Sequence, residues 1–222
     1  MCLVHALHTY RRRARFPYEL IAVTLDQGKF TEPIDSVKEA LSAIGVPWVI
    51  REDPRTLELV RDRVVHGCDV CSRNRRGALY RIASELDCNV LALGHTADDC
   101  AEALFRNVMF NGRLGALPPV ADSRGGELRI VRPLVFVTEE STARYALEHQ
   151  LTTLGCVCGE KVGPRSEIRA FLDQMGGLHP GVRESITAAL GNVNPYTLFD
   201  SKLTKEGADV PAFAVSEPAL SS

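Results

Sequence analysis

Residues 89–99 read Asn-Val-Leu-Ala-Leu-Gly-His-Thr-Ala-Asp-Asp, and the fold can be inferred outward from this stretch. The apolar run over 89–93 stops abruptly at Gly94-His95, which is typical of a buried strand in a parallel sheet. A helix is predicted directly afterwards, from Ala97 to Phe110. A buried strand that leads into a helix is half of a βαβ unit, the building block of parallel sheets.

The same alternation of strand and helix continues along most of the chain. The other predicted strands are 18–26, 48–50 and 128–134, and the other predicted helices are 34–44, 73–86, 138–150, 166–175 and 181–190. Residues 111–126 are rich in Gly and Pro and predict a loop. This order predicts an α/β domain over 1–206, with a parallel sheet covered on both faces and helices at its C-terminal end. The Ala/Pro/Ser-rich stretch 207–222 predicts a disordered tail.

Composition places the chain among ordinary globular proteins. Its 222 residues are 45% hydrophobic and 24% charged, enough for one domain. No apolar run reaches the roughly 18 residues that a membrane span needs, and Arg11-Arg12-Arg13 follows the first apolar patch rather than preceding it, unlike a signal peptide. We therefore expect a cytoplasmic protein with no membrane partner. A net charge of -2 argues against a wholly basic coat but leaves room for a local basic face.

The cysteines are the first sign of chemistry. Cys68 and Cys71 have C-x-x-C spacing, and Cys156 and Cys158 follow much later. A redox pair would need a thioredoxin-like context, which is missing. A tetrahedral zinc site would use all four thiolates, whereas an iron–sulfur cluster could use three and leave one iron open. Two small buried core residues are a poorer explanation, because charged Asp69 lies between the first pair.

Two groups of arginines allow different interpretations. Arg73, Arg75, Arg76 and Arg81 come directly after the first thiols, so they either form a solvated helix face or hold phosphate or RNA backbone. A second run, Arg11 to Arg13 with Arg15, has no such neighbours, and a solvated surface is favoured there.

Polar residues follow two of the predicted strands. Asp26-Gln27 and Gly94-His95 come at strand ends, where parallel sheets bind ligands. Asp98 and Asp99 open the next helix, where aspartate is a good N-cap. Adjacent carboxylates at such an edge can also hold Mg²⁺, which would neutralise the phosphates of a nucleotide. His95 taken alone is more often a packed loop histidine than a catalyst.

Several motifs in a fixed order together resemble one family, over roughly residues 1 to 200. They are Cys-x-x-Cys-Ser-Arg-x-Arg-Arg-Gly-x-Leu-Tyr-Arg at 68–81, Ala-Leu-Gly-His-x-x-Asp-Asp at 92–99, Leu-Phe-x-Asn at 104–107, Gly-Arg-Leu-Gly-Ala-Leu-Pro-Pro at 112–119, Ile-Val-Arg-Pro-Leu at 130–134, Cys-Gly at 158–159 and Asn-Val-x-Pro at 192–195. Each motif is weak by itself, but the ordered set is specific. It resembles the tRNA 2-thiocytidine synthetases, which replace the 2-oxygen of cytidine 32 in tRNA by sulfur.

The resemblance implies a PP-loop fold, which is Rossmann-like and similar to the adenine nucleotide alpha hydrolases. It also implies ATP, Mg²⁺ and a 4Fe-4S cluster held by three cysteines. By matching position, Cys68 and Cys71 would be two of the ligands and Cys158 the third. Cys156 is the alternative third ligand, because this chain has Cys-x-Cys where the family usually has Cys-x-x-Cys.

The resemblance also implies roles and partners. Asp98 or Asp99 would hold Mg²⁺, and Arg75 would stabilise charge on the transferring phosphoryl group. Asp26-Gln27 and Gly94-His95 are expected to bind the nucleotide. The expected partners are tRNA and a sulfur donor such as a cysteine desulfurase system, and a homodimer is left open.

One departure from the family lies at the start of the chain. The family begins with a strand that leads into Ser-Gly-Gly-x-Asp-Ser, a loop that cradles phosphate. Here residues 1–7 match the helix after that loop, so we expect a domain that lacks its first strand, as a start codon assigned too late would produce. The alternatives are a non-catalytic cluster-binding or tRNA-binding remnant, a zinc-stabilised relative, or a related tRNA 2-thiouridine synthetase.

Overall fold

The computed structural model describes residues 1–28, 30–31, 33–53, 56, 58, 68–123, 125–155, 163–200 and 203, with the backbone alone for 68–71. Cys156, Cys158 and the predicted tail 207–222 lie outside these residues. None of the described helices combines the length and the apolar character that crossing a membrane requires.

Helices and strands alternate as predicted. The helices are α1 (Cys2–Tyr10), α2 (Asp35–Ala43), α4 (Cys68–Glu85), α5 (Ala97–Asn111), α6 (Glu139–Glu148), α7 (Pro164–Leu178) and α8 (Val182–Ala189), with a short 3-10 helix at Pro195–Thr197. The strands are β1 (Ala22–Asp26), β2 (Trp48–Glu52), β3 (Val90–Ala92), β4 (Val120–Asp122) and β5 (Arg129–Val131). Helix α4 begins five residues before the predicted helix, because it includes both cysteines of the first motif.

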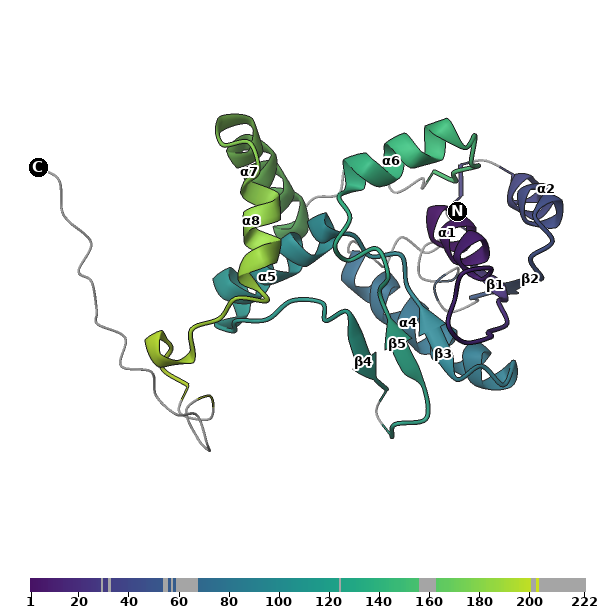
Figure 1. Cartoon of the computed structure of the whole chain (residues 1–222), viewed down its shortest axis with the longest axis horizontal. Coiled ribbons are helices and arrows are strands. Elements are labelled where there is room, and N and C mark those ends of the chain that lie inside the picture. Colours follow the sequence, from purple (N-terminus) through teal and green to yellow (C-terminus); the bar gives the residue numbers. More distant parts are fainter. Residues whose placement is uncertain are drawn as a thin grey trace, which may run out of the picture.

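The strands form parallel pairs, with one exception. Strand β1 pairs with β2 and β3 pairs with β5, both parallel, while β4 joins β5 antiparallel in the order β3-β5-β4 (Figure 1). Strand β4 is a correction, because residues 111–126 were predicted to be a loop throughout. A turn at Gly125 and Gly126, both with positive φ, lets the chain double back between β4 and β5. The high glycine content that allows this hairpin also conceals the strand in the sequence.

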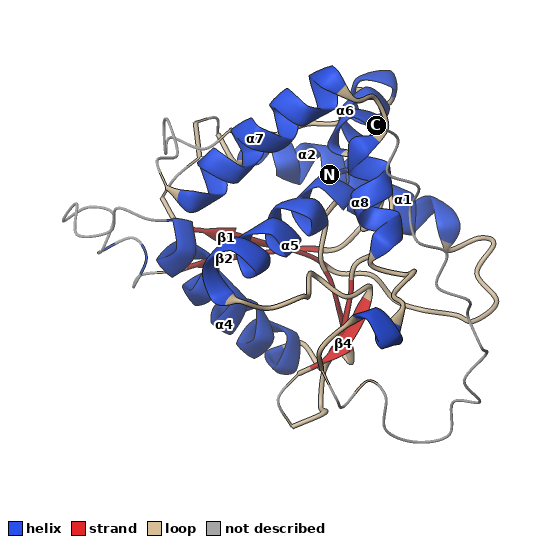
Figure 2. Ribbon diagram, turned by 90° about the vertical axis from the view of Figure 1, so that its left-hand side faces the viewer, coloured by secondary structure: helices blue, strands red, loops and turns tan. Residues whose placement is uncertain are grey.

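The two faces of β1 are covered by different helices (Figure 2). Ala22 packs with Val37 and Leu41 of α2, whereas Leu25 packs with Ala78 and Ile82 of α4. Successive side chains of a strand point to opposite faces, so positions 22 and 25 fall on different sides. The expectation of a sheet covered on both faces is confirmed for this strand.

The C-terminal helices form a second core. Ala101 of α5 packs with Ile168 and Leu172 of α7, and Phe105 and Ile186 border this cluster. Helices α5, α7 and α8 therefore lie together on one side of the strands, which Figure 1 shows clearly. This packing brings α7 and α8 close to the first turn of α5, where the paired aspartates lie.

Candidate functional site at the carboxyl ends of the strands

Strands β3 and β5 end side by side and carry functional candidates beyond their last residues. Ala92 is the partner of Val131 in the parallel register, and the Leu93 amide donates to the Val131 carbonyl at 2.9 Å. His95 and Arg132 therefore follow neighbouring strand ends. Ligands of parallel sheets bind at this edge.

The paired aspartates occupy the first turn of α5, and protein donors bond all four of their carboxylate oxygens. Asp98 accepts from Arg183 Nη1 at 2.7 Å and from the Glu139 amide at 2.6 Å. Asp99 accepts from the amide and hydroxyl of Thr96, which is the N-cap, and from Arg165 Nη2 at 2.7 Å. The expected capping role therefore falls to Thr96, with Asp99 completing a capping box as the third helical residue. The Mg²⁺ role of both aspartates stays a prediction.

His95 lies among several charged groups. Burial lowers the pKa of His95, and Arg132, Arg75 and Arg165 lower it further, while Asp99 opposes them. The structure therefore brings three predicted residues, His95, Asp99 and Arg75, into one electrostatic neighbourhood. Gly94, just before His95, is exposed, and a Cβ there would make only ordinary contact with Leu3 at 3.9 Å.

A second polar cluster lies at the ends of β1 and β2. Gln27 donates to Asp53 at 3.2 Å and to Thr56 at 3.3 Å, and the Gly28 amide donates to Asp26 at 2.7 Å. Burial opposes ionisation of Asp53, but hydrogen bonds from Thr56 and Gln27 outweigh it and lower the pKa of Asp53. Asp26 and Gln27 thus lie at the expected edge, and their nucleotide-binding role stays a prediction.

Comparison with known proteins identifies the family. The chain is 37% identical over 213 residues to the tRNA-cytidine(32) 2-sulfurtransferase of Anaeromyxobacter dehalogenans strain 2CP-C, covering 93% of this chain and 73% of that protein. It is 38% identical over 206 residues to the enzyme of the same name from Paracoccus denitrificans, and the match covers 90% of this chain and 69% of that protein. The chain belongs to the tRNA-cytidine(32) 2-sulfurtransferase family. The resemblance read from the ordered motifs is confirmed.

A solved structure supports the fold of this sulfurtransferase family member. The chain resembles the U34-tRNA thiolase NcsA from Methanococcus maripaludis, solved with its 4Fe-4S cluster. The TM-score is 0.66 at 23% identity, over 86% of this chain and 66% of that one. The likeness confirms the predicted α/β fold class. No protein-family model matches the chain.

In this member of the sulfurtransferase family, the structure describes the backbone of the first cysteine motif and the residue just before the second. Cys68 and Cys71 lie in the first turn of α4, three residues apart, a spacing that places two residues on the same side of a helix. Just before Cys156, the Gly155 carbonyl accepts from the Thr31 amide at 3.3 Å, in the segment that follows β1. Thiolates are the usual ligands of iron–sulfur clusters, and the ligand roles of Cys68, Cys71 and Cys158 stay predictions.

Two residues of the family motifs, together with Cys100, fix the loop between α5 and β4. Asn107 donates to the Gly115 carbonyl and Arg132 Nη1 to the Pro118 carbonyl, both at 2.7 Å. The thiol of Cys100 donates to the Leu117 carbonyl at 3.3 Å. Burial raises the pKa of Cys100, so this thiol stays protonated and differs from the predicted ligands.

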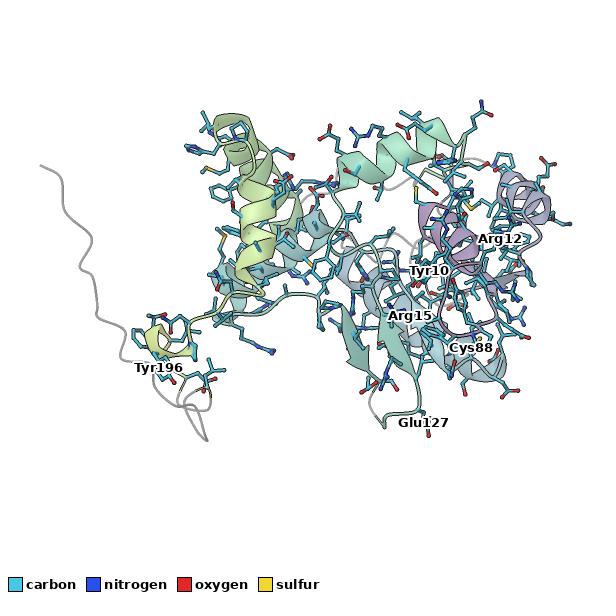
Figure 3. All side chains as sticks on the ribbon, viewed as in Figure 1. Tyr10, Arg12, Arg15, Cys88, Glu127 and Tyr196 are labelled. Carbon is cyan, nitrogen blue, oxygen red and sulfur yellow. The ribbon has the colours of Figure 1, made fainter. Side chains whose placement is uncertain are left out.

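The arginine groups lie on exposed surface. Arg73, Arg75, Arg76 and Arg81 are exposed along α4. The second run, Arg11 to Arg13 with Arg15, is also exposed. Among the described residues, none of these arginines forms an ion pair. Figure 3 shows Arg12 and Arg15 near the end of α1, which suits the solvated surface favoured for this run.

Sequence reasoning missed the ion pairs around the aspartates. Arg183 of α8 bonds Asp98, and Arg165 of α7 bonds both Asp99 and Glu102. Burial acts against the charge of Arg165, but hydrogen bonds and charges of Glu102 and Asp99 raise its pKa. The sequence offered one sign of a buried ion pair, which is that charged Glu102 lies between Ala101 and Ala103. Both alanines are buried in the core. The arginine partners of Glu102 lie more than sixty positions away and could not be read from spacing.

Proposed function

We propose that this chain is an ATP-dependent tRNA sulfurtransferase that converts cytidine 32 of tRNA into 2-thiocytidine. The observation that carries the proposal is its identity of 37% over 93% of the chain to curated members of that enzyme family. The polar strand edge with adjacent carboxylates and arginines is chemically suited to handling a nucleotide.

The proposed cofactors are those that the family resemblance implies. Cys68, Cys71 and Cys158 would hold a 4Fe-4S cluster, with Cys156 as the alternative third ligand. When bound by three thiolates, such a cluster supplies an iron position open to sulfur. Asp26-Gln27 and Gly94-His95 would bind ATP.

The chemistry requires activation of a poor leaving group. The 2-oxygen of cytidine attacks the α-phosphorus of ATP, and pyrophosphate leaves. Sulfur then attacks C2, and the oxygen departs as part of AMP. Arg75, whose charge acts on His95, would stabilise negative charge on the transferring phosphoryl group.

Asp99 is the better of the two candidates for holding Mg²⁺. Its side chain is 26% exposed, against 10% for Asp98. Its arginine partner, Arg165, also bonds Glu102 at 2.7 Å. If Asp99 released Arg165 to bind the metal, Arg165 would still be paired with Glu102. Arg183 bonds Asp98 from a side chain only 18% exposed. We therefore assign the metal to Asp99 and a docking role to Asp98.

The proposed partners are tRNA and a sulfur donor, for which a cysteine desulfurase system has the required chemistry. The protein would act in the cytoplasm, where its substrate is found, without a membrane partner. Single-stranded loops of RNA are bound by arginines and stacking aromatics. On α4, Tyr80 comes four residues after Arg76 and directly before Arg81.

The test is thiolation by anaerobically purified protein with ATP, Mg²⁺, sulfide and unmodified tRNA. Nucleoside mass spectrometry should find 2-thiocytidine, and Cys71→Ser should abolish both bound iron and product. Cys88→Ser is the matched control, because Cys88 lies beyond the opposite end of α4 (Figure 3) and should keep both. Full activity of Cys71→Ser would refute the cluster assignment. Formation of 2-thiouridine instead would favour the related uridine synthetase.

A further inference from the structure

The exposed face of helix α4 carries a glycine for which the described part of the fold gives no reason. Gly77 lies in the middle of α4 and is exposed, and its φ is not positive. Beyond the adjacent helix backbone, a Cβ built there would meet none of the described atoms within 4 Å. Glycine inside an exposed helix lowers stability relative to alanine. A ligand that approaches the helix backbone closely would, in contrast, favour the missing side chain.

The side chains that share this face of α4 are basic or aromatic. Residues three or four positions apart lie on the same face of a helix. At this spacing from Gly77 the chain has Arg73, Tyr80 and Arg81. Arg76 is three positions after Arg73 and four before Tyr80, so it borders the same face. The glycine therefore lies in the middle of a positively charged surface.

The arginines of this face have no counter-charge from the protein. Arg73, Arg76 and Arg81 are exposed, and no described carboxylate forms an ion pair with any of them. Burial lowers the pKa of Arg132, which follows β5, and the charge of Arg76 lowers it further, so a fourth arginine lies near this face. Unpaired guanidinium groups attract phosphate by charge and by paired hydrogen bonds.

We propose that the face of α4 centred on Gly77 is the surface against which the sugar-phosphate backbone of tRNA lies. The inference rests on the proposed function, which makes tRNA the substrate. The missing Cβ would let the RNA backbone approach the helix. Arg73, Arg76 and Arg81 would bond its phosphates. Tyr80 would stack on an unpaired base.

The test replaces Gly77 by alanine and measures stability and tRNA binding separately. Because the added methyl group meets no other side chain of the described fold, Gly77→Ala should raise the thermal unfolding temperature by about 2–4 °C. The same variant, purified anaerobically, should bind unmodified tRNA about tenfold more weakly than wild type in a fluorescence anisotropy titration. A tRNA affinity equal to that of wild type would overturn the inference. A lower unfolding temperature would also overturn it, because the fold itself would then need the glycine.

Gly177→Ala is the matched control. Gly177 is an exposed glycine of α7, and a Cβ there likewise meets none of the described atoms within 4 Å. Its replacement should leave tRNA affinity unchanged. Equal weakening by both variants would show that the loss does not come from α4 and would overturn the inference. A wild type that binds no tRNA would refute the proposed function instead.

Two further measurements identify the bound group as RNA phosphate. Arg76→Gln should reduce the slope of log affinity for tRNA against log salt by about one, as loss of one phosphate contact does. Gly77→Ala should bind ATP as tightly as wild type. An unchanged salt slope would remove phosphate from this face, and a loss of ATP affinity would place nucleotide there rather than RNA. Either result would overturn the inference.

Discussion

At the level of single residues, the site consists of carboxylates whose partners come from distant helices. Asp98 and Glu102 are among the few charged residues that are buried in the described part of the chain, and each meets an arginine. Asp99 lies between them and is more exposed. This graded exposure is the basis for proposing that Asp98 and Glu102 dock helices and that Asp99 holds the metal.

Replacing Asp99 by Asn tests its proposed metal role. The amide can still accept a hydrogen bond from the Thr96 amide, so the helix start should persist, but it has lost the charge that attracts Mg²⁺. We expect the cluster to be retained and thiolation to slow by about two orders of magnitude. Iron content and single-turnover product formation measure the two effects, and unchanged turnover would remove Asp99 from the mechanism.

His95 should make stability depend on pH. Burial lowers the pKa of His95 in the folded protein below its ordinary value of 6.5. Below that value the unfolded chain binds a proton more readily than the folded chain, so the free energy of unfolding falls as pH drops from about 7 to 5. Burial lowers the pKa of His5 as well, and it contributes in the same direction.

His95→Gln should therefore flatten this pH dependence in part. Urea unfolding at several pH values between about 7 and 5 measures it, and exposed His179→Gln controls for loss of a histidine as such. An unchanged slope in His95→Gln would show that His95 does not remain neutral in the folded protein.

At the level of elements, α5 links the site to the C-terminal helices. Its N-terminus carries the aspartates within a capping box, and its buried Ala101 packs on α7. Small residues at such positions let two helices approach closely. The geometry of the site consequently depends on how α7 packs.

Leu172→Ala should test that dependence. Leu172 is completely buried between α5 and α7, and truncation would leave a cavity that costs about 2–5 kcal/mol of unfolding free energy. Leu178→Ala, on the same helix but 65% exposed, should change it by less than about 0.5 kcal/mol. Chemical denaturation measures both variants, and equal effects would contradict the packing described for α7.

At the level of the whole molecule, a buried ion pair joins the C-terminal helices to the α/β part. Arg183 of α8 bonds Asp98, and the second oxygen of Asp98 accepts from the amide of Glu139 at the start of α6. Asp98 thereby connects three helices. An acceptor at a helix N-terminus also interacts favourably with the helix dipole.

Arg183→Ala should destabilise the protein by about 3 kcal/mol, because it leaves a buried carboxylate without its counter-charge. Arg129→Ala is the control, since Arg129 pairs with Asp122 on the surface with exposures of 61% and 56%, and its loss should cost at most about 1 kcal/mol. Thermal and urea unfolding measure both. Equal losses would mean that the Asp98 pair is no stronger than a surface pair.

The order of the elements follows from local patterns and was predictable. Apolar runs that end in polar residues marked β1 and β3, and the apolar periodicity of residues 97–110 marked α5 within one residue of its end. Strand β4 was missed, because its three residues are too short for a periodic pattern and lie among glycines and prolines. The polar residues at two strand ends, Asp26 at the end of β1 and His95 after β3, were also predicted, because residues after parallel strands commonly bind ligands. The separation of these strands into two sheets was not predicted.

Family membership likewise followed from the sequence, since it depends on motifs in a fixed order and comparison confirms it. The ion-pair partners of the buried carboxylates could not be predicted from the sequence. Glu102 and Arg165 are separated by 63 positions and Asp98 and Arg183 by 85, and no local rule relates such positions. Whether a carboxylate docks a helix or faces a ligand depends on its burial and its donors, which arise only when α7 and α8 pack against α5.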